Sequence, residues 1–344
     1  FEWEMGDRST VEEAFAAARH HVSLDLINNR VVLAAIETRG ALAEYDPDGC
    51  EGRGKYTLTT TTQMPNPMRE QLADQILGVA REQVRVLVHE VGGGFGGKNS
   101  LFPEYPLCLL AARQLGRAVK WIGQRGDAFV TDFHGRDNIM RAEMAFDDEC
   151  HFLAIRVASQ ADMGAYAAGR GVVSPVNGMI MLSNCYRIPL MYAEVWGRYT
   201  NTVPTDPYRG AGRPEVLFMI ERMMDVAADQ MKIDRVELRR RNLIPPEDFP
   251  YASPTGLNYD ACDFATVIDG AMQQADWPGF EARRREAKAR GRLRGIGMAN
   301  YIERCGGGAG LSEAARLEID DGGGVTVYSG SMANGQAHET AFSQ

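Results

Sequence analysis

Five glycines and a lysine stand together in the segment Gly92-Gly93-Gly94-Phe95-Gly96-Gly97-Lys98. It follows residues 84–88, which we expect to form a β-strand because most of them are β-branched. The segment fits the dinucleotide-binding pattern GxGxxG, and it misses the P-loop pattern only at Asn99, where Ser or Thr is needed. Glycines allow bare backbone N–H groups to approach an anionic or metal-oxo ligand. The segment is therefore a candidate binding loop, with a ligand-free turn as the alternative.

Both nucleotide-binding interpretations of this loop lack their sequence context. A dinucleotide-binding loop leads directly into a helix and is followed by an acidic residue about 20 positions later. Here Pro103 and Pro106 interrupt, and no acidic residue ends the expected strand at residues 118–122. A P-loop without its hydroxyl also lacks a magnesium ligand. A P-loop-like nucleotide-binding protein remains an alternative that depends on this loop alone.

Two arginines and two glutamines add further polar groups. Arg209 and Arg213 flank Gly-Ala-Gly and can present forked, permanently charged donors, although a helix start with surface ion pairs explains them equally well. Gln63 follows four threonines, and an uncharged amide can hydrogen-bond an oxo ligand without neutralising it. The segment 335–340 contains Gln336 and His338, whose neutral donors and acceptors suit pterin edges. No thiolate or histidine cluster accompanies these groups to bind a metal directly.

The elements that must position these groups mix helices and strands. Apolar periodicity and capping residues predict helices at residues 10–19 with Thr10 as N-cap, 67–77, 105–115, 215–231, 236–242, 263–274 and 280–291. Residues rich in β-branched side chains predict strands at 31–45, 55–61, 84–88, 118–122, 155–159 and 191–199, and again near Gly295, Leu317 and Val325.

Composition excludes several classes of protein. The net charge of −9 disfavours nucleic acid as a ligand, because phosphate binding needs a concentrated positive surface. No segment approaches the roughly 18 uninterrupted apolar residues that cross a bilayer. The six cysteines show no CxxC pair or regular spacing, so we expect reduced thiols in a soluble, cytoplasmic protein. The chain begins with Phe1 and has no signal-like opening, and we expect it to be a piece of a longer protein.

The glycine loop, residues 202–215 and residues 335–340 resemble, in order and spacing, three signature segments of the large subunit of molybdenum hydroxylases, the family of xanthine dehydrogenase, aldehyde oxidase and carbon monoxide dehydrogenase. The resemblance extends to residues 28–30, 37–39, 134–137 and 237–246. It implies an α+β fold of two-layer α/β molybdenum-cofactor-binding domains. Residues 1–290 would form the first domain, and residues 291–344 would be the truncated beginning of the second.

The resemblance also implies roles for individual residues. Gln63 matches the glutamine that hydrogen-bonds a molybdenum oxygen ligand, Phe95 the residue whose backbone lies beside the metal, and Arg209 an arginine near the metal centre. All three would make second-sphere or backbone contacts only, because the pterin dithiolene ligates the metal. Ala337 stands where the family usually has glycine. The other cofactor contacts implied are Gly93, Gly94, Gly96, Gly335, Gln336, His338 and Thr340.

Subfamily differences narrow the substrate that the resemblance implies. Carbon monoxide dehydrogenases have a copper-binding cysteine where Gly210 stands, which disfavours CO oxidation. Asn99, Asn177 and Ala211 stand where purine hydroxylases have a glutamate, an arginine and a phenylalanine. We therefore expect hydroxylation of an aldehyde or an N-heteroaromatic carbon with oxygen from water.

Further components must complete such an enzyme. The general-base glutamate of the family lies in a C-terminal segment that this chain lacks, so we expect the piece alone to be inactive. The chain has no iron–sulfur cysteine set and no flavin fingerprint. The resemblance implies a small subunit with [2Fe–2S] clusters, a medium FAD subunit and the remainder of the large subunit, in a dimer of heterotrimers, with molybdopterin cytosine dinucleotide as cofactor. A non-catalytic assembly fragment is the second alternative.

Overall fold

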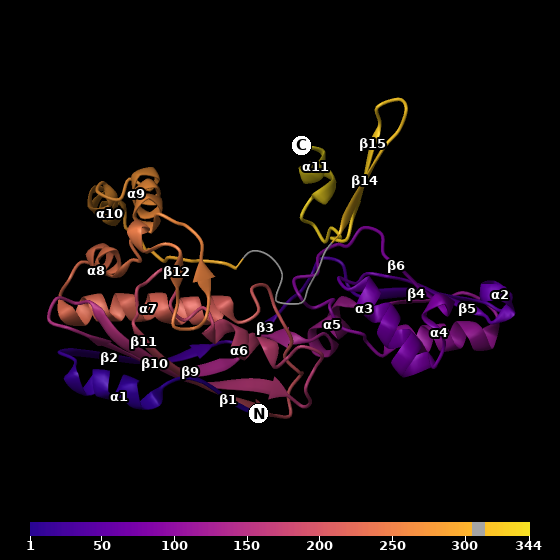
Figure 1. Cartoon of the computed structure of the whole chain (residues 1–344), viewed down its shortest axis with the longest axis horizontal. Helices are drawn as coiled ribbons and strands as arrows, with labels where there is room; N and C mark the ends of the chain where they lie inside the picture. The colour runs from indigo at the N-terminus through magenta and orange to yellow at the C-terminus, as the bar shows by residue number, and fades with distance from the viewer. Residues whose placement is uncertain (305–313) are drawn as a thin grey trace. The chain divides into compact units, whose positions relative to one another are not determined.

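The structure is a computed structural model that describes residues 1–304 and 314–344, and it divides into two compact units (Figure 1). The first unit contains residues 1–30, 136–205 and 210–303, and the second contains residues 31–135, 206–209 and 304–344. The division passes through the signature segment 202–215, because Arg209 belongs to one unit and Gly210 to the other.

The first unit is built on a five-stranded sheet in the order β1-β11-β10-β9-β2, in which β10 and β11 run parallel and the other neighbours antiparallel. Helix α7 packs on one face over a large apolar core, and α1 packs on the other through Val11 and Phe15 (Figure 1). The strands are β1 (Glu2–Gly6), β2 (His20–Asn28), β9 (Asn138–Phe146), β10 (Phe152–Gly164) and β11 (Leu190–Tyr199).

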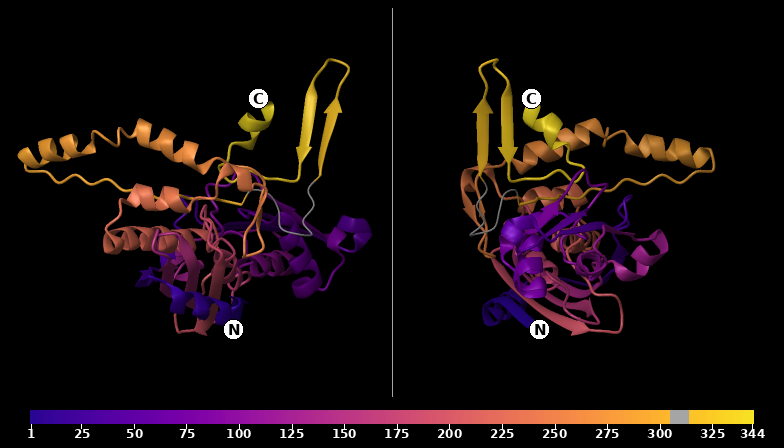
Figure 2. Two further views of the ribbon diagram at one scale, coloured as in Figure 1. Left: turned by 60° about the vertical axis from the view of Figure 1, so that its left-hand side comes forward. Right: turned by 90° about the vertical axis from the view of Figure 1, so that its right-hand side faces the viewer.

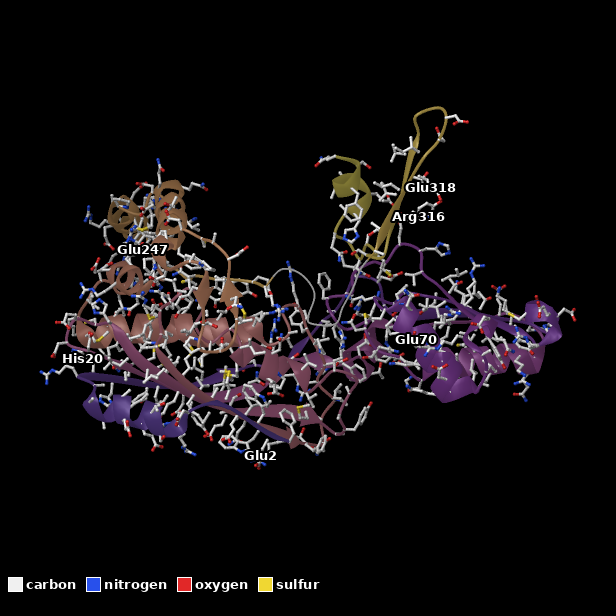
Figure 3. The ribbon with its side chains drawn as sticks, in the orientation of Figure 1. Glu2, His20, Glu70, Glu247, Arg316 and Glu318 are labelled. Atoms are coloured by element: carbon white, nitrogen blue, oxygen red, sulfur yellow. The ribbon has the colours of Figure 1, made fainter. Side chains whose placement is uncertain are left out.

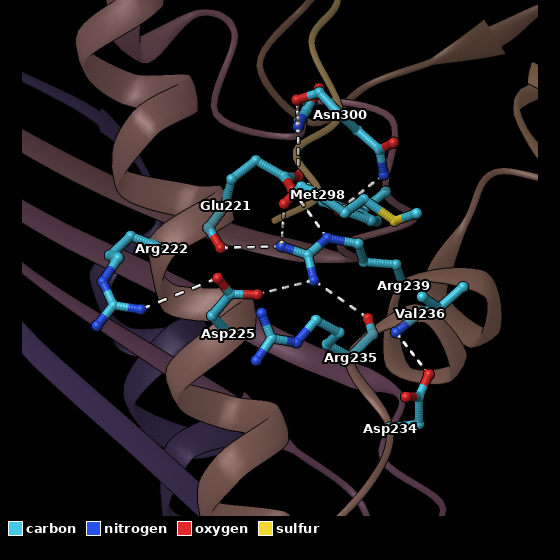
Figure 4. A network of polar contacts seen from close by, with 11 residues as sticks. Glu221, Arg222, Asp225, Asp234, Arg235, Val236, Arg239, Met298 and Asn300 are labelled. Atoms are coloured by element: carbon cyan, nitrogen blue, oxygen red, sulfur yellow. Dashed lines mark hydrogen bonds and ion pairs between the residues drawn. The ribbon is translucent and has the colours of Figure 1, made fainter. Parts of the chain in front are cut away.

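Helices and short strands complete the first unit. The helices are α1 (Arg8–Ala17), α6 (Val173–Met179), α7 (Arg213–Met231), α8 (Arg235–Asn242), η3 (Pro246–Asp248), α9 (Phe264–Gln274) and α10 (Phe280–Ala289). The strands β12 (Tyr251–Ala252) and β13 (Asn258–Tyr259) pair with each other. Arg239 on α8 is fully buried and bonds Glu221 and Asp225 of α7, so it joins the two helices (Figure 4).

The second unit is built on a four-stranded sheet in the order β6-β5-β4-β7, with β5 and β6 parallel. Helix α4 packs against β4, and its buried residues include Tyr105 and Leu109. The strands are β4 (Gly40–Asp46), β5 (Lys55–Thr60), β6 (Val84–Leu87) and β7 (Val119–Ile122), with a separate pair β3 (Val31–Val32) and β8 (His134–Gly135). The helices are α2 (Gly49–Gly52), α3 (Pro65–Glu70), η1 (Gln71–Leu77), η2 (Arg81–Gln83), α4 (Glu104–Leu115) and α5 (Arg125–Thr131).

The C-terminal residues form a hairpin and a short helix, β14 (Ala315–Ile319), β15 (Val325–Ser329) and α11 (His338–Ser343). Figure 2 shows the hairpin as two long antiparallel arrows, in which Leu317 pairs with Val327. Arg316 and Glu318 lie on β14 and form an ion pair (Figure 3).

The expected mixture of helices and strands is confirmed, with three corrections. The cap of α1 is Asp7 instead of Thr10, because the Asp7 carboxylate accepts the N–H groups of Ser9 and Thr10. The expected strand at residues 31–45 is interrupted at residues 33–39, where Ala34 has a positive φ of 47°. No strand forms near Gly295 among the described residues, although residues 295–302 alternate between exposed and half-buried.

Two expectations concern membranes and thiols. Among the helices of the described residues, none is both long and apolar enough to cross a bilayer. Cys50, Cys108, Cys150, Cys185 and Cys262 are free thiols. Cys305 lies outside the described residues.

Candidate functional site

Glu37 holds both ends of the glycine loop. Its carboxylate oxygen Oε2 accepts the N–H of Gly92 at 2.7 Å and pairs with the ammonium of Lys98 at 3.0 Å. The backbone N–H of Glu37 also donates to the carbonyl of Gly92 at 3.0 Å. The first and last residues of the loop, Gly92 and Lys98, are therefore bound to the same carboxylate.

Lys98 cannot act as a phosphate-binding lysine in this arrangement. Its side chain is 4% exposed, and its Nζ is occupied by Glu37. Burial lowers the pKa of Lys98, and the hydrogen bond and charge of Glu37 oppose that shift. A P-loop lysine must reach the phosphates of its ligand. The geometry contradicts the P-loop alternative.

The amide of Gln63 is fixed against the loop by its oxygen. Oε1 accepts the N–H of Gly96 at 2.9 Å and the N–H of Lys98 at 3.3 Å. Because only the oxygen of an amide accepts hydrogen bonds, these two contacts decide which end of the amide faces the loop. The NH₂ group of Gln63 makes no hydrogen bond with any residue that the structure describes. Gln63 therefore retains an uncharged double donor for a ligand.

The glycines of the loop admit neighbouring protein groups. A Cβ at Gly94 would lie 2.4 Å from Cδ of Gln63, and a Cβ at Gly96 would lie 2.0 Å from the carbonyl oxygen of Pro207. Gly96 also has a φ of 100°, which disfavours any side chain. The sequence predicts that bare backbone N–H groups of this loop can approach a ligand, but the chain itself accepts most of them. In the described structure, Gly94 and Phe95 are the loop residues whose N–H groups have no protein acceptor.

Phe95 and Arg209 meet at the crest of the loop. The N–H of Arg209 donates to the carbonyl of Phe95 at 2.9 Å, and the guanidinium carbon lies 5.9 Å from the centre of the Phe95 ring. Phe95 has a left-handed φ of 53° and is 42% exposed, so it is held in a strained and open position. Asp206 fixes the approach of this segment by accepting the hydroxyl of Ser100 at 2.8 Å. The second unit thus brings Gln63, Gly93–Gly96 and Arg209 together, as the sequence predicted.

Residues 210–215 of the signature segment 202–215 belong to the first unit. The amide of Asn177 donates to the carbonyl of Ala211 at 3.3 Å, so two of the predicted substrate-pocket residues are neighbours. Ala211 has a φ of 47°, and a Cβ on the following Gly212 would lie 1.7 Å from the carbonyl oxygen of Ser174. The third predicted pocket residue, Asn99, lies in the second unit and donates its backbone N–H to Gly96 at 3.2 Å.

A buried ion pair that the sequence did not predict supports the segment 202–215. Glu215 at the start of α7 is 2% exposed and pairs with Arg136 at 2.7 Å. Burial raises the pKa of Glu215, and the charge of Arg136 opposes the rise. The usable signal was the acidic residue in the first turn of a predicted helix, where the helix dipole favours an anion.

The C-terminal motif forms a tight turn into α11. Gly335 has a φ of 109° and Ala337 a φ of 58°, so the alanine occupies a backbone conformation that favours glycine. The side-chain oxygen of Gln336 accepts the N–H of Asn334. The His338 ring stacks on Phe342 with centroids 5.0 Å apart, and its Nδ1 is buried without a protein partner in the described structure. Thr340 is exposed on the same helix.

One group of described residues could supply three metal-binding atoms, Asp147, Glu149 and His151 in the turn between β9 and β10. Asp147 uses one oxygen to accept the N–H groups of Glu149 and His151, which explains the cluster as a turn. Glu149 and His151 are exposed. Exposed acidic groups of this kind are common without an ion, so the group adds no site.

Comparisons with known proteins place the chain in a family. A family model described as molybdopterin cofactor-binding domain matches residues 1–243, and a second of that description matches residues 270–344. The carbon monoxide dehydrogenase large chain of Hydrogenophaga pseudoflava is 32% identical over 100% of this chain and 44% of its own length. The nicotine 6-hydroxylase large subunit of Paenarthrobacter nicotinovorans is 32% identical over 97% of this chain and 42% of its own length.

Solved structures agree with these relatives. Quinoline 2-oxidoreductase from Pseudomonas putida 86 has a TM-score of 0.90 and 30% identity over 99% of this chain and 44% of that chain. A Cu,Mo-CO dehydrogenase has a TM-score of 0.88 and 28% identity, again over 99% of this chain and 45% of that one. The expected α+β fold is confirmed, and the chain spans less than half the length of the relatives it matches. The chain belongs to the molybdopterin cofactor-binding domain family, as part of a large subunit of the carbon monoxide dehydrogenase and xanthine dehydrogenase type.

Proposed function

We propose that this chain is the molybdenum-cofactor-binding part of an oxidoreductase that hydroxylates an aldehyde or N-heteroaromatic carbon with oxygen from water. The observation that carries the proposal is the fixed amide of Gln63, whose oxygen is bound to the loop while its NH₂ group is left without a protein acceptor. Beside it, Phe95 presents its ring and carries Arg209 on its carbonyl.

The residues present fit the cofactor by the chemistry of their donors. Gln63 offers two uncharged N–H donors, Gly94 and Phe95 offer backbone N–H groups, and Arg209 carries a permanent cation. Such a set suits an anionic, oxygen-bearing group whose metal is ligated by its own pterin. When bound, that group supplies the two-electron oxidation of the substrate. In the C-terminal segment, the buried Nδ1 of His338 offers a further polar contact near Gly335, Gln336 and Thr340.

Gly210 separates the proposed substrate class from CO. The glycine has a φ of 90°, and a Cβ there would lie 2.4 Å from Cγ of Pro214. Glycine supplies no thiolate for copper, and a cysteine at this position would not fit without rearrangement. Ala211 and Asn177 bring no cation or aromatic ring for a purine. Among the similar proteins, nicotine 6-hydroxylase and quinoline 2-oxidoreductase are named for N-heteroaromatic substrates.

The partners and the finer identity of the cofactor belong to the same proposal. We infer a small [2Fe–2S] subunit and a medium FAD subunit, a dimer of heterotrimers, a cytoplasmic location, and molybdopterin cytosine dinucleotide as the form of the cofactor. We also propose that the two cofactor-binding domains divide at residues 290 and 291. Membership of the family supports the partners and the form of the cofactor, whereas the second family match begins at residue 270, ahead of the proposed boundary.

The proposal is tested on the complete, purified complex. Elemental analysis should find molybdenum and iron, and the released pterin should carry cytosine. The complex should reduce a dye with quinoline or an aromatic aldehyde, and much more slowly with xanthine or CO. Residues 1–344 alone should not turn over. A complex without molybdenum, or one that prefers xanthine or CO, would contradict the proposal.

A further inference from the structure

Glu37 contacts none of the groups that we assign to the cofactor, yet it governs the loop that carries them. We propose that Glu37 is a positioning residue: through Lys98 and Gly92 it fixes the loop that aims the amide of Gln63. This inference rests on the proposed function of Gln63.

Lys98 connects Glu37 to Gln63, because it bonds both residues. The backbone N–H of Lys98 donates to the amide oxygen of Gln63, and its carbonyl accepts the N–H of Gln63 at 2.9 Å and the hydroxyl of Thr62 at 3.0 Å. A shift of Lys98 therefore moves both the side-chain and the backbone partners of Gln63. The ammonium of Lys98 is in turn held by Glu37 at 3.0 Å.

The backbone on either side of Glu37 is anchored. Arg125 donates to the carbonyls of Ala35 at 2.5 Å and Ile36 at 2.7 Å. Arg39 is 3% exposed and pairs with Asp132 at 2.6 Å and Glu104 at 2.8 Å. Both anchors lie within two residues of Glu37, so its carboxylate has little freedom to follow a displaced loop.

Charge explains why the pair acts as a clamp. Lys98 is desolvated and Arg125 lies near it, so its ammonium needs the opposite charge of Glu37. Without Glu37 the buried cation must find water or lose its proton, and either change displaces the loop end. Glu37 is 38% exposed and can be hydrated if Lys98 is removed. The two partners are therefore unequal, and the loss of Glu37 should cost more.

The test uses the complete enzyme with Glu37→Ala, Lys98→Met and the double variant. Glu37→Ala should lower kcat about 10- to 100-fold, the range for residues that orient a metal's first contacts. Molybdenum content and KM should change little. The electron paramagnetic resonance spectrum of half-reduced molybdenum should change, because the amide of Gln63 is no longer held in place. Glu37→Gln keeps the acceptor for Gly92 and should recover part of the loss.

The double variant separates positioning from simple damage. Lys98→Met removes the stranded cation, so Glu37→Ala with Lys98→Met should lose less than the product of the two single losses. The matched control is Glu70→Ala on α3, which breaks the exposed pair with Arg81 and should leave kcat and the spectrum unchanged (Figure 3). If Glu37→Ala does not fold, Lys98→Met alone decides, since it leaves no buried charge unpaired.

Two kinds of failure are distinguishable. A wild-type complex without molybdenum or turnover would overturn the proposed function itself. A loaded, active wild type whose Glu37→Ala variant keeps its kcat and spectrum would overturn only the role of Glu37. A loss that follows molybdenum content alone would also overturn that role, and so would a Lys98→Met variant that folds and behaves as wild type when Glu37→Ala cannot be obtained.

Discussion

Arg239 in the first unit and Gln63 in the second are both polar side chains held by several hydrogen bonds, but they differ in what is left over. Arg239 is fully buried, and its three nitrogens bond the carboxylates of Glu221 and Asp225 and nearby carbonyls including that of Met298 (Figure 4). Gln63 uses its oxygen on the loop and keeps its NH₂ group. A side chain whose hydrogen-bonding groups are all used by the protein, here called saturated, indicates a structural role. A fixed side chain with an unused donor, here called unsaturated, indicates a binding site.

The largest effect should come from breaking the saturated centre. Arg239→Met leaves the buried Glu221 without its cation and Asp225 with only the more distant Arg222, and breaking a buried pair from one side costs about 3–5 kcal/mol. We expect a fall of several degrees in the thermal midpoint of the subunit, measured by calorimetry. Arg241→Met is the control, because its partner Glu237 is exposed and the pair is worth at most about 1 kcal/mol. Equal losses in the two variants would contradict the contrast.

Gln63→Glu tests the unused donor directly, because it removes the NH₂ group and keeps the acceptor. The carboxylate can still accept from Gly96 and Lys98, but it brings a negative charge where a donor is needed. We expect kcat to fall about 10- to 100-fold, or roughly 1.4–2.7 kcal/mol of activation free energy, with little change in the thermal midpoint. The measurement is steady-state turnover of the loaded enzyme.

Gln83 provides a matched glutamine whose amide is used at both ends. It is 9% exposed, donates to the carbonyls of Arg53 at 2.7 Å and Gly54 at 3.1 Å, and accepts the N–H of Ala80 at 3.2 Å. Gln83→Glu should therefore lower stability and leave turnover per molybdenum unchanged. If the two glutamines responded alike, the distinction between saturated and unsaturated amides would be lost.

The sequence predicted which residues form the site better than it predicted the hydrogen bonds that hold them. Gln63, Phe95 and Arg209 lie far apart in the chain, and the structure joins Phe95 to Arg209 and seats Gln63 on the same loop. What the sequence could not show is which groups use up the N–H donors of the loop. That depends on the approach of Glu37, which lies 55 residues before Gly92 and which the sequence alone does not place against the loop.

Local fold errors have a similar origin. Both Asp7 and Thr10 are good N-caps, and the choice depends on where the chain leaves β1. The segment near Gly295 has strand-like alternation, but Arg239 and Asn184 hold it through single carbonyls, of Met298 and Asn300, and no neighbouring strand pairs with it in the described chain. Pairing is a tertiary property that periodicity does not contain.

Asp162 should give a smaller effect that depends on pH. Burial alone would raise its pKa, but the N–H of Gly164, the hydroxyl of Thr200 and the charge of Arg30 outweigh burial and lower it. A carboxyl with a lowered folded-state pKa stabilises the protein above its unfolded pKa of about 3.9, and this stability disappears as pH falls through the folded value. Asp162→Asn should flatten the acid side of the stability curve in urea unfolding between about pH 5 and pH 3. An unchanged acid slope would contradict a lowered pKa of Asp162 in the folded protein.

The smallest expected effect concerns the backbone conformation of one residue, Ala337. It lies in the left-handed region just before α11, where a non-glycine residue costs about 1–2 kcal/mol, whereas Ala341 lies inside that helix and donates its N–H to the carbonyl of Ala337 at 3.0 Å. Ala337→Gly should relieve strain, offset in part by about 0.5–1 kcal/mol of added freedom in the unfolded chain, and so slow amide hydrogen exchange in residues 338–343 slightly. Ala341→Gly removes the same methyl group at a position that is already helical. It should lower the free energy of opening of this helix by about 1 kcal/mol and so speed exchange. Opposite signs would show that the turn before α11 is strained, and faster exchange in both variants would show that it is not.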